Sequence, residues 1–151
     1  MKKLQLLPIL ALLFLLNVAS TCSNDDNSSS SNQTQVSNTV TSGTWRITLY
    51  NDSGTVKTAN YTGYNFTFGA NNVLLATNSS NNYSGTWSVT DSNSTDDSLS
   101  DLDFNILFTT PANFADLSDD WDIVSRTDNK IELIDVSGGN GGTDYLTFEK
   151  N

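Results

Sequence analysis

The residue types that most often carry catalysis are scarce in this chain. It has no histidine and a single cysteine, Cys22, against 17 acidic and 7 basic residues. Without histidine the usual general base near neutral pH is missing, and so is every histidine-dependent triad or zinc site. Carboxylates are the remaining groups for acid–base chemistry. We expect a protein that is not an enzyme and that binds no cofactor.

Asp101 and Asp103 are the best-placed carboxylates, because they lie two residues apart in a stretch where polar and apolar residues alternate. Two such groups act as acid and base only when their surroundings push their pKa values apart. The alternative, which we favour, is that they form the wet outer face of a strand. The inner face of that strand would carry four large apolar residues: Leu102, Phe104, Ile106 and Phe108.

Calcium binding is the metal chemistry that suits acidic loops best. Asp119, Asp120 and Asp122 are close in sequence, but Trp121 between them indicates a strand, which would send them to different faces. Residues 139–146 resemble one glycine-rich, calcium-binding turn. Because that motif holds calcium only between stacked copies, we predict ordinary turn glycines here and no metal site.

The overall charge argues against nucleic acid as a partner. The formal net charge is −10, and lysine and arginine form no cluster along the chain. Nucleic-acid phosphates would be repelled by such a surface. Acidity of this kind usually serves solubility.

The first 21 residues have the three zones of a secretory signal peptide. Lys2 and Lys3 precede an almost wholly apolar stretch at residues 4–16, and small residues follow it. The stretch is shorter than the about 20 residues that cross a bilayer. Its length is that of a signal-peptide core, so we predict that residues 1–21 are a signal peptide.

Cys22 stands where a lipid anchor would be attached. The preceding residues, Ala-Ser-Thr at 19–21, together with Cys22 resemble the lipobox of bacterial lipoproteins, and a long polar stretch follows. As the only cysteine, Cys22 has no disulfide partner within the chain. The resemblance implies lipidation of Cys22 and attachment to a membrane through acyl chains. The alternative is an ordinary cleavage site beside an incidental cysteine.

Two further expectations concern residues 22–42. Residues 23–26, Ser-Asn-Asp-Asp, resemble the acidic export signal of surface lipoproteins from the Bacteroidetes, which implies the outer face of the outer membrane. A solvated linker on a periplasm-facing protein is the alternative. Residues 23–42 contain only two apolar residues, Val36 and Val40, so we predict a disordered tether spanning about 25 Å.

Residues 43–151 form one all-β domain, because period-two alternation recurs between clusters of Gly, Asn, Ser and Asp. One short helix is expected at residues 111–117, with Thr110 as its cap. The predicted strands cover eight ranges: 44–50, 63–68, 73–77, 84–90, 99–109, 120–126, 130–135 and 143–150.

Eight short strands with short connections favour an antiparallel up-and-down meander closed as a small barrel. A β-sandwich is the alternative, since alternation does not distinguish the two. The large inward aromatic residues could line a cavity for a small apolar ligand or could fill the interior themselves. These residues are Trp45, Phe66, Phe68, Trp87, Phe104, Phe108, Trp121 and Phe148.

The Gly-Thr-Trp sequence at residues 43–45 resembles the Gly-X-Trp opening of lipocalins, and the later Gly-Thr-Trp at 85–87 and Trp-Asp-Ile at 121–123 are similar to small lipocalin-like lipoproteins. The resemblance covers nearly all of residues 43–151 and implies a barrel with a ligand cavity. In lipocalins a basic residue near the end of the barrel stacks over that Trp. This chain departs from the pattern: its last strand ends in Lys150, and no arginine follows Arg126.

Overall fold

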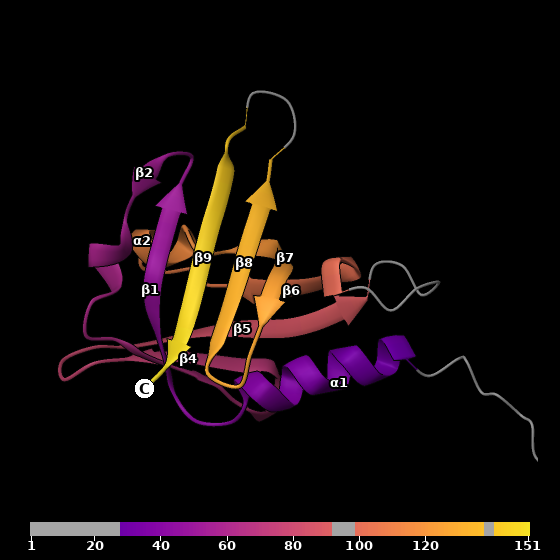
Figure 1. Ribbon diagram of the computed structural model, residues 1–151. Helices are drawn as coiled ribbons and strands as arrows, with labels where there is room; N and C mark the ends of the chain where they lie inside the picture. The colour runs from indigo at the N-terminus through magenta and orange to yellow at the C-terminus, as the bar shows by residue number, and fades with distance from the viewer. Residues whose placement is uncertain (1–27, 92–98, 138–140) are drawn as a thin grey trace, which may run out of the picture.

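The computed structural model describes residues 28–91, 99–137 and 141–151, which form a closed antiparallel barrel of eight strands with one extra strand (Figure 1). The strands neighbour one another in the order β2-β1-β3-β4-β5-β6-β7-β8-β9, and a further pairing of β1 with β9 closes the sheet. The predicted up-and-down barrel is therefore confirmed over the sandwich. Its strands are β1 (Trp45–Asp52), β2 (Thr55–Val56), β3 (Asn65–Phe68), β4 (Val73–Thr77), β5 (Asn82–Asp91), β6 (Leu102–Leu107), β7 (Asp119–Arg126), β8 (Lys130–Val136) and β9 (Thr143–Lys150).

The closing seam between β1 and β9 is long, whereas the contact between β1 and β3 is brief. The β1–β9 register runs from Trp45 opposite Lys150 to Asn51 opposite Tyr145, while β1 and β3 share only the pair Trp45 and Phe66. In Figure 1, β1, β9 and β8 run steeply in front, and β5 and β6 cross behind them. The two groups of strands thus face each other across one core.

The strand bounds follow the alternation in the sequence closely. β4 and β9 have the predicted bounds, and most other strands differ by one or two residues at an end. The fifth predicted strand is shorter than expected. Its first residues form a 3-10 turn, η3 (Leu99–Asp101), before β6 begins at Leu102. Asp101 therefore does not share a strand face with Asp103.

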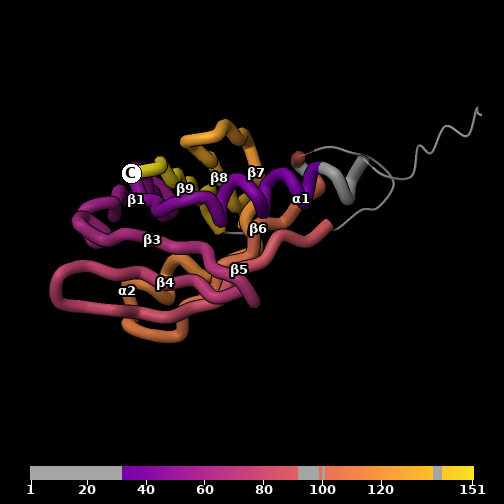
Figure 2. Tube along the Cα trace, turned by 90° about the horizontal axis from the view of Figure 1, so that it is seen from below, coloured from indigo at the N-terminus to yellow at the C-terminus, as the bar shows by residue number. Residues whose placement is uncertain are grey.

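The predicted disordered tether, residues 23–42, is wrong over most of its length, because Ser28–Val40 forms a helix, α1. Val36 and Val40 lie one helical turn apart and are both fully buried against the barrel. The polar composition of residues 23–42 by itself favoured a disordered segment. Docking of an apolar stripe, rather than intrinsic propensity, stabilises most helices in proteins, and two valines supply that stripe here. Figure 2 shows α1 running across one end of the barrel.

Two smaller differences concern turns. β2 was not predicted; it pairs with the end of β1 through a turn at Ser53 and Gly54, both with positive φ (48° and 90°). The short helix exists as α2 (Ala112–Ala115), but it begins after Pro111, and Thr110 does not cap it. Two more 3-10 turns, η1 (Thr58–Tyr61) and η2 (Ala70–Asn72), flank β3.

Several predictions concern the N-terminal region. Residues 1–21, Cys22 and residues 23–26 lie outside the described residues. In the part of the chain that is described, no helix has the length and apolar character needed to span a membrane.

Candidate functional site

The eight aromatic residues predicted to point inward all do so. None is more than 7% exposed. Phe68 lies at the centre of the group, with ring centroids 5.4 Å from Phe148 and 5.5 Å from both Trp87 and Phe104, each in edge-to-face geometry. These are the separations of directly packed rings. The rings therefore occupy the middle of the barrel themselves.

α2 and η1 close one end of the barrel with a second aromatic cluster. Phe114 of α2 is fully buried, and its ring lies 4.8 Å from Tyr83, 5.0 Å from Tyr64 and 5.4 Å from both Tyr61 and Phe108. Buried tyrosines need partners for their hydroxyl groups. Two backbone carbonyls provide them.

These two hydrogen bonds tie the α2 segment to β1 and η1. Tyr50 Oη donates to the carbonyl of Asp116 and Tyr61 Oη donates to that of Asn113, each at 2.6 Å. Burial, followed for Tyr50 by the nearby carboxylate of Asp52, raises the pKa of both phenols far above the usual value. Both tyrosines are therefore neutral hydrogen-bond donors across the physiological pH range.

α1 closes the opposite end with few apolar groups and several hydrogen bonds. Trp45 Nε1 donates to the carbonyl of Val40 at 2.8 Å. The guanidinium of Arg126 donates to Thr39 Oγ1 at 2.8 Å and to Gln35 Oε1 at 3.1 Å. The buried indole and the arginine thus hold the helix over the core.

Lys150 covers the ring of Trp45, although it is a lysine near the end of the last strand and not an arginine. Its ammonium group lies 5.0 Å from the centroid of the Trp45 ring, a cation–π distance. The two residues are also direct partners in the β1–β9 register. A lysine at the end of the last strand therefore covers the indole of the first strand.

The carboxylates suggested by the sequence do not form a paired acid–base site. Asp103 faces outward on β6, and its pKa is raised by partial burial and then by the like charges of Asp120, Asp122 and Asp91. Asp101 belongs to the preceding turn. Across the described residues, no three Asp, Glu or Cys side chains are close enough to hold a metal ion. The glycine-rich stretch at 139–146 lies partly outside the described residues.

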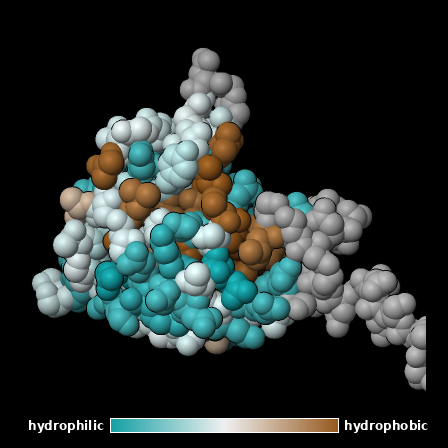
Figure 3. Space-filling model, in the orientation of Figure 1, coloured by the Kyte–Doolittle hydropathy of each residue, from teal (hydrophilic) through white to brown (hydrophobic). Residues whose placement is uncertain are grey.

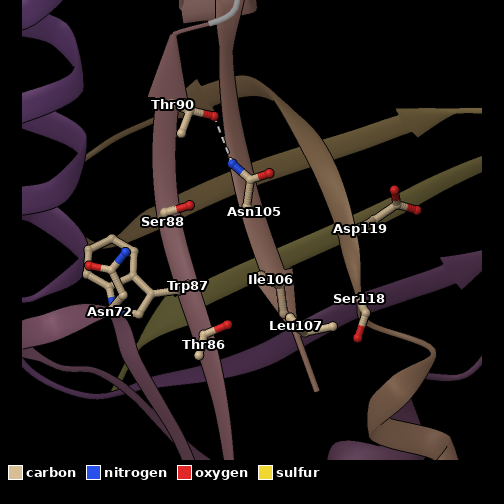
Figure 4. Close-up of a pocket in the computed structure, with 10 residues that line it drawn as sticks. All are labelled: Asn72, Thr86, Trp87, Ser88, Thr90, Asn105, Ile106, Leu107, Ser118 and Asp119. Atoms are coloured by element: carbon tan, nitrogen blue, oxygen red, sulfur yellow. Dashed lines mark hydrogen bonds between the residues drawn. The ribbon is translucent and has the colours of Figure 1, made fainter. Parts of the chain in front are cut away.

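A groove crosses the outer face of β5, β6 and the start of β7 (Figure 4). Two adjoining hollows of about 480 and 200 Å³ share Thr86 and Leu107 in their walls. Another hollow, of about 380 Å³, lies outside the barrel between α1 and the β7–β8 turn. All three open to solvent on the outer surface.

Alternate residues of β5 line the groove with hydroxyl groups. Figure 4 shows Thr86, Ser88 and Thr90 in a row, with Asn105 and Leu107 along the neighbouring strand. Asn105 Nδ2 donates to Thr90 Oγ1 at 2.9 Å, and Leu107 is 53% exposed. This row was not predicted, although Ser and Thr occupy every second position from residue 84 to residue 90 in the sequence.

One carboxylate also lines the groove, at its β7 side. Burial raises the pKa of Asp119 to about 6, and a side-chain hydrogen bond with Asp120 and the charge of Asp135 also raise it. Asp119 Oδ1 accepts a hydrogen bond from the backbone N–H of Asp120 at 2.9 Å. The groove therefore combines hydroxyl and amide groups with a larger apolar area to which Trp87, Ile106 and Leu107 contribute. Among the described residues that line it, one ionisable group lies at its margin.

A second outer surface is apolar. Val124 of β7, Val136 of β8 and Tyr145 of β9 are 58%, 63% and 43% exposed. In Figure 3 hydrophobic colour gathers over β8 and β7 beside strongly hydrophilic surface. Isolated apolar side chains are common on protein surfaces, but these three lie on consecutive strands.

Comparisons with known proteins give one similar structure. No protein-family model and no curated protein matches the chain. The crystal structure of a DUF4847 family protein from Bacteroides vulgatus ATCC 8482 is similar, with a TM-score of 0.46 and 18% sequence identity, over 77% of this chain and 97% of that one. A similarity at this level does not assign the chain to a family.

Proposed function

We propose that this chain is a lipid-anchored protein of the bacterial outer membrane whose barrel binds its partners through its outer surface. The single observation that supports an outer binding surface is the interior packed with aromatic rings and covered at both ends by α1 and α2. A barrel of eight strands is just wide enough either to be filled by side chains or to hold one small ligand. Here the rings take that space. The proposal includes no catalytic step and no cofactor.

The membrane part of the proposal depends on Cys22 and the lipobox-like residues before it. Because α1 begins at Ser28, the stretch from Cys22 to the helix can span at most about 20 Å. An acylated Cys22 would thus keep the barrel close to the membrane surface. The Ser-Asn-Asp-Asp sequence at residues 23–26, with its two aspartates, favours the outer face of the outer membrane over the periplasmic face.

Acylation is tested by growing cells that express the full-length chain with an alkyne-labelled fatty acid. The wild-type chain is expected to carry the label and to sediment with membranes, whereas Cys22→Ser is expected to lose both properties. Accessibility of the barrel to added protease on intact cells separates the two membrane faces. A wild-type chain without label would contradict the anchor.

The proposal that the interior holds no ligand is tested by titrating the protein with fatty acids of about 8 to 16 carbons, which are small enough to enter a ligand-binding barrel. We expect no change in the fluorescence of Trp45 and Trp121, which are fully buried in the core, when both are observed in a Trp87→Phe background. Trp87 is replaced because it lines the outer groove and would also report a molecule bound there. Phe68→Ala is the matched control: it removes the central ring, opens a cavity and should create binding where the wild type has none.

The competing function, capture of a small hydrophobic ligand inside the barrel, makes the opposite prediction. Saturable quenching in the wild-type protein would require the interior to open around a ligand. That result would replace the outer-surface proposal with a lipocalin-like binding function.

A further inference from the structure

We propose that the outer groove over β5 and β6 binds neutral saccharide chains. This inference depends on the proposed function, because it names the class of ligand that one part of the outer surface would take. The groove is lined by the hydroxyl row of β5, by Asn105, Leu107 and Thr109 along the β6 side, and by Asp119. Trp87 and Ile106, which are mostly buried, and the polar residues Asn72 and Ser118 complete the lining.

The hydroxyl row offers unused hydrogen-bonding groups at regular spacing. Outward residues on one strand repeat every about 6.6 Å, so Ser84, Thr86 and Ser88 form a line. Among the described residues, none forms a hydrogen bond with the hydroxyl groups of these three. A side-chain hydroxyl group both donates and accepts, as a sugar hydroxyl group does. The row can therefore match a ligand that carries hydroxyl groups along its length.

The charge and apolar content of the groove restrict the ligand further. Among the described residues that line the groove none is lysine or arginine, and Asp119 alone has an ionisable side chain. A phosphorylated or acidic ligand would find no counter-charge in a chain of net charge −10. The exposed side chain of Leu107 in the middle of the groove supplies an apolar contact for the C–H face of a sugar ring. A neutral, amphipathic, hydroxyl-rich molecule fits these features.

The position of the groove disfavours a polypeptide ligand. Extended peptides most often bind a sheet by pairing with a free strand edge. β5 is hydrogen-bonded to β4 and β6, and β6 is hydrogen-bonded to β5 and β7, so neither strand has a free edge. An incoming molecule can meet only side chains here. The two hollows continue along the strands from Thr90 to Ser84, which suits a chain rather than a single sugar ring.

The test is calorimetric titration of the full-length chain with neutral hexasaccharides of glucose, mannose, galactose and xylose. We expect at least one of them to bind. The double variant Thr86→Val, Ser88→Ala should weaken that binding about tenfold, because it removes two hydroxyl groups that face the groove while keeping the shape of the strand. Thr67→Val is the matched control: it makes the same change on the outer face of β3, outside the groove, and should bind like the wild type.

Three outcomes would overturn the proposal. They are the absence of binding by all four hexasaccharides, binding that the double variant leaves unchanged, and displacement of the saccharide by an uncharged Gly-Asn-Ser peptide of equal length. The double variant changes neither Cys22 nor the aromatic interior. A negative result in the saccharide titration would therefore refute only the saccharide proposal. The acylation and fatty-acid experiments would still test the proposed function separately.

Discussion

The two ends of the barrel are closed in different ways. At the α2 end the closure is aromatic, with Phe114 packed among five other rings and the α2 segment held by two tyrosine hydroxyl groups. At the α1 end it is mostly polar, with two valines and hydrogen bonds from Trp45 and Arg126. Both arrangements exclude solvent from the same core. The difference shows that a small barrel can be sealed either by burying large rings or by fixing a weak helix through specific hydrogen bonds.

This contrast predicts that the two ends differ in stability. Burial of an aromatic side chain contributes several kcal/mol, whereas a net hydrogen bond contributes about 1 kcal/mol. The α2 end should unfold together with the barrel. The α1 end should open locally before it, because fewer buried apolar contacts hold the helix.

Phe114→Ala should have the largest effect, because it removes a fully buried ring at the centre of the α2 cluster. The expected loss is about 3–5 kcal/mol in the free energy of unfolding. Urea denaturation measures it, with Val124→Ala, at an exposed position, as the control that should change stability little. A loss of unfolding free energy smaller than that caused by Val40→Ala in α1 would contradict the proposed difference in stability between the two ends.

Val40→Ala should have an intermediate effect confined to α1. It removes two buried methyl groups, worth about 1.5 kcal/mol. Amide hydrogen exchange should speed up throughout Ser28–Val40 while the β-strands keep their protection. Asn38→Ala changes an exposed residue of the same helix and should leave the exchange of its neighbours unchanged. Faster exchange in the strands as well would show that α1 is part of the cooperative core.

Asp119 should make the α2 end sensitive to pH, because burial raises its pKa from the ordinary value of 3.8 to about 6. Between these two values the folded state holds a proton that the unfolded state has released. Asp119 therefore favours folding most below about pH 4 and loses that contribution as the pH rises to about 6.

The direction of this pH dependence is checked by measuring urea denaturation of the wild type and of Asp119→Asn at several pH values. The stability difference between them should shift against the wild type as the pH rises through this window. Asp128→Asn, at an exposed turn, is the control for the loss of one carboxylate. Parallel pH curves for the wild type and Asp119→Asn would rule out this role.

Lys150 should have the smallest effect, about 0.5–1 kcal/mol from its cation–π contact with Trp45. Lys150→Met keeps the aliphatic stem and removes the charge, so it should lower the free energy of unfolding by that amount. Lys150→Arg should restore it, since a guanidinium also stacks on an indole. Equal stability of the Met and Arg variants would show that only the stem contributes.

The closed barrel and its inward aromatic residues could be predicted from the sequence, because period-two alternation directly reports which face of a strand is buried. The same rule explains why β4 and β9 have the predicted bounds.

The two Gly-Thr-Trp sequences look alike, but glycine is required in each for a different reason. Gly43 has a positive φ of 94°, whereas a Cβ at Gly85 would lie 2.4 Å from the carbonyl oxygen of Leu107.

α1 and the groove could not be predicted in this way. Two valines in a Ser- and Asn-rich stretch carry too little signal for a helix until the surface on which they dock is known. The hydroxyl row of β5 was readable, but its hollow shape depends on how β5, β6 and β7 curve together. The Lys150 contact required the register of the closing seam.

The central claim is that the barrel interior is filled, and methyl NMR tests it most directly. The methyl groups of Ile131, Leu133 and Leu146 lie in the buried core, away from the outer groove, and would report any molecule that entered the interior. During titration with dodecanoate these signals should stay in place in the wild type and shift in Phe68→Ala. Saturable shifts of the same methyl groups in the wild-type protein would contradict the claim.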